Sequence, residues 1–281
     1  MTPFNSKLLM LAGDTHGNMS HVITLLDNAK NAGASRIFQL GDFGAWEHTM
    51  DGVKFFDAVS RYALSTGIKF YFLDGNHDKT SLVLEKYSET KDDEGFLVVR
   101  PNLFYAPRGH RWTWQGTRFI ALGGAYSVDK GWRIETEYDN RLKSEQRAAR
   151  TGKAAKIWRE TLWFPEEEMT DVEYQAIVNA DSSLVDIILS HDKPRGSNPS
   201  WNRKDLLECL PNQDRLQDAL VRLQAKRLYH GHLHYPYVDM VRAGDGRYAR
   251  VEGLDCDPTA ASHPGYQKAD SWTFLDLPLE D

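Results

Sequence analysis

The feature that most constrains this fold is a set of histidines placed directly after short apolar runs of the chain. Five of the ten histidines lie in turns rich in glycine and aspartate, just past segments that have the composition of buried strands. They are His16, His77, His191, His232 and His234. Asp14, Asp42 and Asn76 take equivalent places in the same turns. Because ligands of α/β sheets bind outside the carboxyl ends of the strands, we expect these turns to meet in one crevice.

The order of apolar runs predicts an α/β fold. The first ninety residues alternate strand-like and amphipathic segments, as in βαβ units, and shorter β runs follow, for which antiparallel pairing is expected. Strands are expected at residues 7–12, 36–40, 69–73, 97–99, 103–106, 111–114, 118–122, 185–189, 227–229, 237–241, 248–254 and 272–277. Helices are expected at residues 18–32, 52–65, 82–87, 165–180 and 205–225. We interpret residues 1–281 as a single domain with a helical insertion at about 127–182 near the site.

Composition narrows the function classes. A net charge of −6 argues against a domain that coats nucleic acid by bulk charge, although it leaves local basic patches open. The longest apolar stretches are far shorter than the ~20 residues that span a bilayer, and the start of the chain lacks the apolar core of a secretory signal. We therefore expect a cytoplasmic protein. The two cysteines are too few for a disulfide framework or a thiolate metal site.

The side chains in these turns are of the chemical types that bind metal ions. Imidazole, carboxylate and amide oxygen without thiolate suit a pair of divalent ions, and Mn²⁺ is favoured, with iron or Zn²⁺ as alternatives. Two such ions with two aspartates and one hydroxide carry a net charge of about +1, which attracts phosphate oxyanions. The sequence thus predicts a phosphate-directed metal centre in an acidic chain.

The ordered motifs resemble one known family. Gly-Asp-Thr-His-Gly at 13–17, Gly-Asp at 41–42, Gly-Asn-His-Asp at 75–78, a lone His191 and Gly-His-Leu-His at 231–234 resemble the calcineurin-like metallophosphoesterase superfamily. The resemblance implies a four-layer α/β/β/α sandwich of two mixed sheets flanked by helices. It also implies that Asp42 bridges two ions, one held with Asp14, His16 and His234, and the other with Asn76, His191 and His232. Asp42 and His77 are then the catalytic residues, and Asp78 or Asp42 orients the His77 ring.

The motif around Asp42 departs from the family pattern. In the family the third position beyond this aspartate is usually acidic and often followed by an arginine, which helps to bind phosphate in the protein phosphatase branch. Here that position is Ala45, and Glu47 lies two residues further on, which weakens the likeness to that branch. Substrate contacts must therefore come from elsewhere, and Arg133 and Arg195 are the candidates because guanidinium groups bind phosphate oxygens in pairs. Five aromatic residues near the insertion either stack on a nucleobase or pack the insertion onto the core: Tyr126, Trp132, Trp158, Trp163 and Trp201.

The predicted function is metal-dependent phosphoester hydrolysis of monoesters, diesters or both, by a hydroxide that bridges two divalent ions. The expected substrate is a phosphoester, with a nucleotide as one candidate, and no membrane partner is expected. The alternatives within the enzyme class are a nucleotide or 2′,3′-cyclic phosphodiesterase, a protein phosphatase and a nuclease. The acidic charge and the lack of a separate DNA-binding domain argue against the nuclease. A non-catalytic scaffold and a purely regulatory metal-binding protein are the alternatives from a different class.

Overall fold

The computed structural model describes residues 5–156, 161–199 and 206–279, and it forms two six-stranded mixed sheets flanked by helices. The first sheet has the order β12-β1-β2-β3-β5-β4 and the second β10-β11-β9-β8-β7-β6. The first contains β1 (Asn5–Ala12), β2 (Ala34–Leu40), β3 (Lys69–Leu73), β4 (Leu97–Arg100), β5 (Leu103–Tyr105) and β12 (Trp272–Asp276). The second contains β6 (Arg111–Trp114), β7 (Thr117–Leu122), β8 (Ile187–Ser190), β9 (Arg227–His230), β10 (Tyr237–Arg242) and β11 (Tyr248–Gly253). The expected four-layer α/β/β/α sandwich is confirmed.

Six α-helices accompany the sheets in the described part of the chain. They are α1 (Met19–Ala32), α2 (Met50–Thr66), α3 (Thr80–Tyr87), α4 (Lys130–Thr151), α5 (Asp171–Ala180) and α6 (Leu210–Arg222). Short 3₁₀ turns lie at Leu207–Cys209 and Lys268–Ser271. Helix α1 begins where the Asn18 side chain accepts the His21 backbone N–H, and it ends at Gly33, whose left-handed φ of 81° suits glycine. None of the helices in the described ranges has both the length and the apolar character needed to cross a bilayer.

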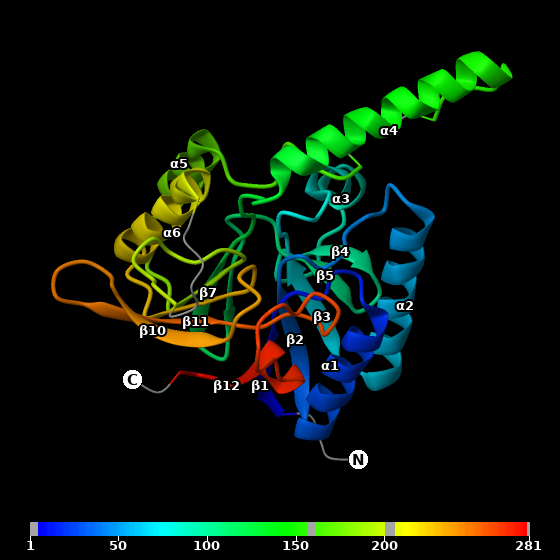
Figure 1. Cartoon of the computed structure of the whole chain (residues 1–281). Helices are drawn as coiled ribbons and strands as arrows, with labels where there is room; N and C mark the ends of the chain where they lie inside the picture. Colours follow the sequence, from blue (N-terminus) through cyan, green and yellow to red (C-terminus); the bar gives the residue numbers. More distant parts are fainter. Residues whose placement is uncertain (1–4, 157–160, 200–205, 280–281) are drawn as a thin grey trace.

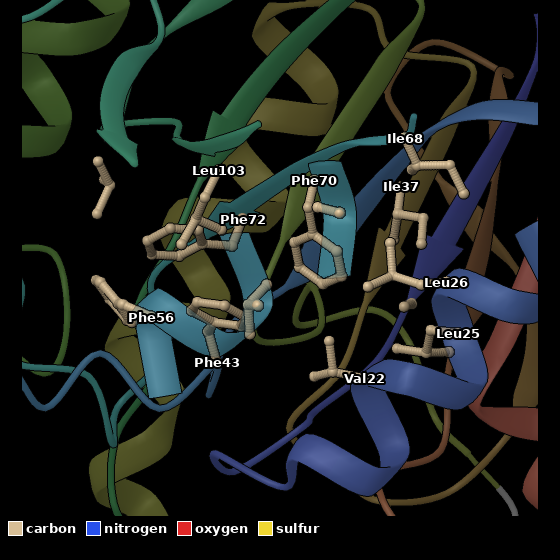
Figure 2. Packing of buried hydrophobic residues seen from close by; sticks show 14 of the residues in the cluster. Val22, Leu25, Leu26, Ile37, Phe43, Phe56, Ile68, Phe70, Phe72 and Leu103 are labelled. Carbon is tan, nitrogen blue, oxygen red and sulfur yellow. The ribbon is translucent and has the colours of Figure 1, made fainter. Parts of the chain in front are cut away.

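Three hydrophobic clusters separate the layers. The first lies between α1, α2 and the first sheet, and Figure 2 shows Val22 and Leu26 of α1 facing Ile37 and Phe70 of the strands. The second lies between the two sheets and includes a stack of parallel aromatic rings. In this stack, Trp112 packs against Phe38 of the first sheet and against Phe119 of its own sheet. The third lies between the second sheet and helices α5 and α6. Because apolar burial is the main stabilising contribution, these clusters fix how the two sheets face each other.

The predicted helices of the insertion were partly wrong. The helix expected at 165–180 begins only at Asp171, after the N-cap Thr170, because the preceding segment is held by tertiary contacts. There, Arg108 Nη2 donates to the Glu166 carbonyl and Lys130 Nζ lies 3.3 Å from Glu167 Oε1. The 22-residue helix α4 was not predicted. None of its residues is buried, and its few apolar residues, such as Ile134, Tyr138 and Leu142, lie in a strongly charged segment, which obscures the helical period although arginine, glutamate and lysine favour helix.

Candidate metal centre

The structure brings the predicted strand-end residues together at one edge of the sandwich. Strands β1, β2 and β3 are parallel neighbours in the first sheet, and β8 and β9 are parallel neighbours in the second. Parallel strands end at the same edge, so the turns that follow these five strands converge. Asp14 and His234, which are 220 positions apart, have their Oδ2 and Nε2 atoms 3.0 Å apart.

One group of donors consists of Asp14, His16 and His234, whose ligand atoms all lie within 4.8 Å of one another. His16 Nε2 lies 3.8 Å from Asp14 Oδ2 and 3.5 Å from Asp42 Oδ2. The four residues expected to hold one ion are therefore adjacent. Asp14 and Asp42 are buried, while His16 and His234 are partly exposed.

A second group of donors surrounds the other side of Asp42. His191 Nε2 lies 3.4 Å from Asp42 Oδ1 and 3.1 Å from Asn76 Oδ1, and the His191 ring is fully buried. The His232 ring is next to it, with 5.0 Å between ring centroids. Asp14 Oδ1 also lies 4.0 Å from His191 Nδ1, so both aspartates lie between the two groups. All seven residues predicted as ligands thus lie in one cluster.

Four of these seven residues have a backbone conformation that is rare for side-chain-bearing residues. Positive φ angles occur at His16 (45°), Asp42 (52°), His232 (63°) and His234 (49°). A left-handed backbone at such residues costs of order 1–3 kcal/mol and persists where the surroundings determine it. The turns are thus strained at the donor positions, as is typical of functional sites.

The glycines of the motifs leave room for the donor atoms. A Cβ at Gly75 would overlap Asp42 Oδ1, and a Cβ at Gly231 would overlap Asp14 Oδ1. Gly41 has a φ of +92°, and a Cβ there would overlap the His191 ring. Glycine directly precedes the donor residues in these motifs because the end of one strand comes very close to the donor atom that follows another strand.

Partners outside the cluster hold the donors in orientation. His191 Nδ1 lies 2.7 Å from the Leu40 carbonyl, so Nδ1–H donates there and Nε2 faces the aspartate. The Asn76 Nδ2 amide donates to Ser127 Oγ at 2.9 Å, which points its Oδ1 toward His191. His16 Nδ1 lies 2.8 Å from Asp257 Oδ2, which leaves Nε2 for a ligand. Such partners fix the ring tautomer and the basicity of metal-binding histidines.

Asp257 was missed by the sequence analysis. It lies in the turn after β11, which is parallel to β9, and so it reaches the same edge. The Asn18 side chain and Thr259 hold its other oxygen. Asp257 could have been found by the sequence pattern that identified the other turns, which is a polar run directly after an apolar strand. The family motifs, however, end before this residue.

The electrostatics of the cluster are dominated by burial of opposite charges. Burial raises the pKa of Asp14 and Asp42, but the neighbouring histidines, His191 for Asp14 and His77 with His191 for Asp42, outweigh it, so both pKa values lie below their usual range. Burial opposes the charge of His191, yet the Asp42 and Asp14 carboxylates raise its pKa to about 10. For His232, burial and then the charge of His191 lower the pKa well below its usual value. Two carboxylates held ionised in this cluster attract cations.

The nitrogen and oxygen donors fit divalent ions. Neither cysteine belongs to the donor groups, and the histidine rings present nitrogen while Asp14, Asp42 and Asn76 present oxygen. This mixture suits Mn²⁺, iron or Zn²⁺ in an open catalytic site rather than a structural thiolate site.

His77 lies at the rim of the cluster. Its backbone N–H donates to Asp42 Oδ1 at 2.8 Å, and its Nε2 is 3.7 Å from Asp42 Oδ2. Burial lowers the pKa of His77; the Asp42 carboxylate opposes that shift, and the Arg133 guanidinium adds to it. The alternative that Asp78 orients this ring is wrong, because the Asp78 carboxylate accepts backbone N–H groups of Phe43, Gly44, Ala45 and Gly75. Asp78 shapes the loop that carries Asp42.

The two predicted substrate arginines have different positions. Arg133 lies in the first turn of α4, with Nη2 3.4 Å from His77 Nε2, and it is held by Asp129 and by the Leu162 carbonyl. Arg195 is not among the residues that line the cavity at the cluster, and its Nε lies 3.7 Å from Asp214 Oδ1 at the surface. The structure therefore brings Arg133, but not Arg195, to the candidate site. Glu47 is buried against Arg100 and Tyr87, away from the donors.

Two hollows meet at His77. The larger, of about 500 Å³, is lined by Asp42, Asn76, His232 and His234 and extends to Lys193 and Tyr235. The smaller, of about 240 Å³, is lined by Trp46, His48, Arg133 and Phe164. Because both include His77, a bound phosphoryl group at the donors would have space on two sides.

The aromatic residues of the insertion have mixed roles. The ammonium of Lys130 lies over the rings of Tyr126 and Trp163, so these two pack the start of α4. Trp132 is 63% exposed. Trp158 and Trp201 lie outside the described residues.

Comparison with known proteins agrees with a fold and site of the two-metal phosphoesterase class. The family model of calcineurin-like phosphoesterases matches residues 8–236. The chain belongs to the calcineurin-like phosphoesterase family and is a metal-dependent hydrolase of phosphoester bonds. The resemblance inferred from the motifs is confirmed.

Solved structures share the fold at low sequence identity. The protein TT1561 of Thermus thermophilus is 12% identical, with a TM-score of 0.52 over 89% of each chain. A dimetal phosphatase from Danio rerio is 16% identical, with a TM-score of 0.50 over 89% of this chain and 87% of that chain. A comparison with curated protein sequences gives no significant match. These structures support the sandwich architecture.

Replacing Asp257 with asparagine should weaken metal binding. Loss of a carboxylate that orients a ligating histidine typically costs 10–100-fold in metal affinity or activity, so a loss of about that size is expected. The Mn²⁺ affinity of Asp257→Asn is measured by titration, with thermal unfolding in chelator to check the fold. Asp245→Asn, in the exposed turn before β11, is the matched control and should bind Mn²⁺ as the wild type does. Equal affinity of Asp257→Asn and wild type would show that Asp257 does not position His16.

Proposed function

We propose that the seven clustered side chains hold two divalent ions, with Asp42 shared between them, and that Mn²⁺ is the preferred metal. One ion is assigned to Asp14, His16, Asp42 and His234, and the other to Asp42, Asn76, His191 and His232. The supporting observation is that the donors lie on both sides of Asp42, with His16 Nε2 at 3.5 Å and His191 Nε2 at 3.4 Å from its two oxygens. When bound, the ions supply acidified water and neutralise phosphoryl charge.

The protein's own groups complete the chemistry. Protonated His77 donates its proton to the oxygen of the leaving group, or stabilises the charge that develops there. Arg133 Nη2, 3.4 Å from His77 Nε2, is placed to bind a phosphoryl oxygen at the same point. Asp42 Oδ1 accepts the His77 backbone N–H, and this hydrogen bond holds His77 in position relative to Asp42. Asp129 and the Leu162 carbonyl hold the guanidinium in this orientation.

We infer that the enzyme accepts phosphodiesters, nucleotide diesters included. A phosphodiester carries two substituents on phosphorus, whereas a monoester carries one. The observation that supports a diester is that the two hollows meet at His77, one on the side of His232 and one on the side of Arg133. A protein phosphatase is less well supported, because the usual acidic position after Asp42 is Ala45 and the nearby Glu47 is committed to Arg100.

The test is turnover on a panel of substrates with Mn²⁺ added to chelator-treated protein. The panel contains an aryl monoester, the matching aryl diester, a 2′,3′-cyclic nucleotide and a phosphopeptide. We expect Mn²⁺-dependent hydrolysis with kcat/KM at least about tenfold higher for the diester than for the monoester, equivalent to ~1.4 kcal/mol. A preference for the monoester or the phosphopeptide would contradict the diester proposal. A scaffold without catalysis would hydrolyse none of the four substrates.

A further inference from the structure

The outer half of α4 and the segment after it carry a charge opposite to that of the whole protein. Residues 141–156 contain six basic side chains and one acidic one, a net charge of +5, in a chain of net charge −6. The basic residues are Arg141, Lys143, Arg147, Arg150, Lys153 and Lys156. A net charge averaged over the chain therefore conceals a local basic segment, which is the electrostatic footprint of polyanion binding.

Three of the four basic residues in the outer half of α4 lie on one exposed face. Lys143, Arg147 and Arg150 are separated by four and three residues, which places them on the same side of the helix, and Trp132 lies eleven positions before Lys143 on that side. All four are exposed. Within the described ranges, Lys143, Arg147 and Arg150 have no ion-pair partner. We call these four residues the α4 face.

The returning chain covers a different side of α4. Ser144 Oγ accepts the Lys156 backbone N–H at 2.6 Å, and Glu137 Oε2 accepts the Thr161 and Leu162 backbone N–H groups. Glu137, Ser144 and Ala148 recur at spacings of seven and four residues, which defines a side distinct from the α4 face. The contacts that hold the helix therefore leave its basic side open to solvent.

The inner end of α4 is anchored at the metal centre. Lys130 is held by Glu167 and by two aromatic rings, and Arg133 lies beside His77. From there the helix projects away from both sheets (Figure 1). The 18 positions from Trp132 to Arg150 correspond to a length of about 27 Å at 1.5 Å per residue. The α4 face thus places three positive charges on the outer half of the helix and Trp132 at its inner end, with the exposed Asp139 on the same side between them.

We propose that the α4 face is a docking arm for a single-stranded nucleic acid, whose phosphates contact Lys143, Arg147 and Arg150 while a base stacks on Trp132 at the inner end of the helix. The proposal rests on the diester function above. A polymer of phosphodiesters is the partner that both features fit: repeated negative charges match the three basic side chains, and the same linkage is the substrate at the metal centre. An anionic membrane would match the charge alone. The nucleic-acid partner was disfavoured by the acidic composition, which does not report how charge is arranged.

The test measures binding separately from catalysis. Full-length, Mn²⁺-loaded protein carrying His77→Asn, which slows cleavage, is titrated into a fluorescently labelled 20-nucleotide single strand, and anisotropy is followed at several salt concentrations. Combined Lys143→Glu, Arg147→Glu and Arg150→Glu should weaken binding at least tenfold at low salt and reduce the slope of log K against log salt by about 2, as expected for three phosphate contacts at ~0.7 each. Trp132→Ala alone should weaken binding about tenfold.

A matched charge reversal controls for net charge. Lys7→Glu, Lys30→Glu and Lys69→Glu change three exposed lysines at the far edge of the sandwich by the same total charge, and binding should stay within about twofold of the parent. Equal weakening by both triple variants, or no effect of the α4 variant, would overturn the proposal. Binding of the α4 variant and its parent to vesicles of anionic phospholipid is measured as well. The proposal would also be overturned if the α4 variant lost vesicle binding but kept its affinity for the strand.

Hydrolysis of the aryl diester distinguishes the two proposals. With His77 intact, the α4 triple variant should hydrolyse this small substrate at the wild-type rate, because the altered residues lie well away from the donors. If the wild type binds the strand through α4 but hydrolyses no diester, the proposed function fails and the docking arm stands. If it hydrolyses the diester but does not bind the strand, the docking arm fails alone.

Discussion

Replacing Asp42 with asparagine is expected to lower kcat/KM for an aryl phosphodiester by about 10³-fold or more and to reduce the number of Mn²⁺ ions bound per chain. The Asp42 oxygens lie 3.4–3.7 Å from nitrogens of His191, His16 and His77. The amide has nearly the same shape but no charge, and it offers one oxygen where the carboxylate offers two. Both halves of the donor cluster should therefore lose affinity for Mn²⁺ in the same variant.

The Asp42→Asn experiment measures bound metal by elemental analysis and turnover over a range of added Mn²⁺. Activity should not return to the wild-type level at high Mn²⁺, because the missing charge also contributes to the chemistry. The matched control is Asp245→Asn, an exposed aspartate in the turn before β11, which should leave both measurements unchanged. Two ions bound and turnover within about tenfold of the wild type would show that Asp42 is not the shared ligand.

Replacing His77 with asparagine is expected to lower kcat by about 10²–10⁴-fold, the usual contribution of a general acid, while the metal content stays at the wild-type value. His77 lies at the rim of the cluster and is not among the seven predicted ligands. The asparagine backbone can still donate its N–H to Asp42 Oδ1, so the donor geometry should persist. Loss of turnover without loss of metal distinguishes a catalytic residue from a ligand.

The leaving group provides the sharper readout for His77. A general acid matters most when the leaving oxygen is basic, so the loss in His77→Asn should be larger for an alkyl or phenyl ester than for a nitrophenyl ester. Arg133→Ala, which removes a neighbouring cation without removing the acid, should slow the two esters by similar factors. Equal losses for both leaving groups in His77→Asn would contradict proton donation by His77.

Much of the site could be predicted because its donors follow strands with strong local signals. Apolar runs such as residues 7–12 and 36–40 are recognisable without tertiary information, and parallel strands place their following turns at one edge. Glycine at 41, 75 and 231 marks the tight approach between strand ends. The motif order then identified the family before any distance was known.

Other parts of the site depend on contacts that have no local signal. The pairing of Asp257 with His16 spans 241 positions and lies beyond the family motifs. Arg133 and Arg195 were equivalent candidates by residue type, and only the packing of α4 placed one of them beside His77. Asp78 was one of two candidates to orient the His77 ring, yet its carboxylate is committed to four backbone N–H groups around Asp42.

The amino-acid sequence alone indicated an α/β fold and the seven side chains that gather at one strand edge, because buried strands and the turns after them are encoded by neighbouring residues. The layered sandwich followed from the resemblance of the ordered motifs to a known family. The tertiary structure alone decided which groups orient those donors, which arginine reaches the site, and that a 22-residue helix extends its basic side into solvent. A helix without a buried face shows only a weak apolar period within a charged segment, and a net charge carries no information about where charges lie in space.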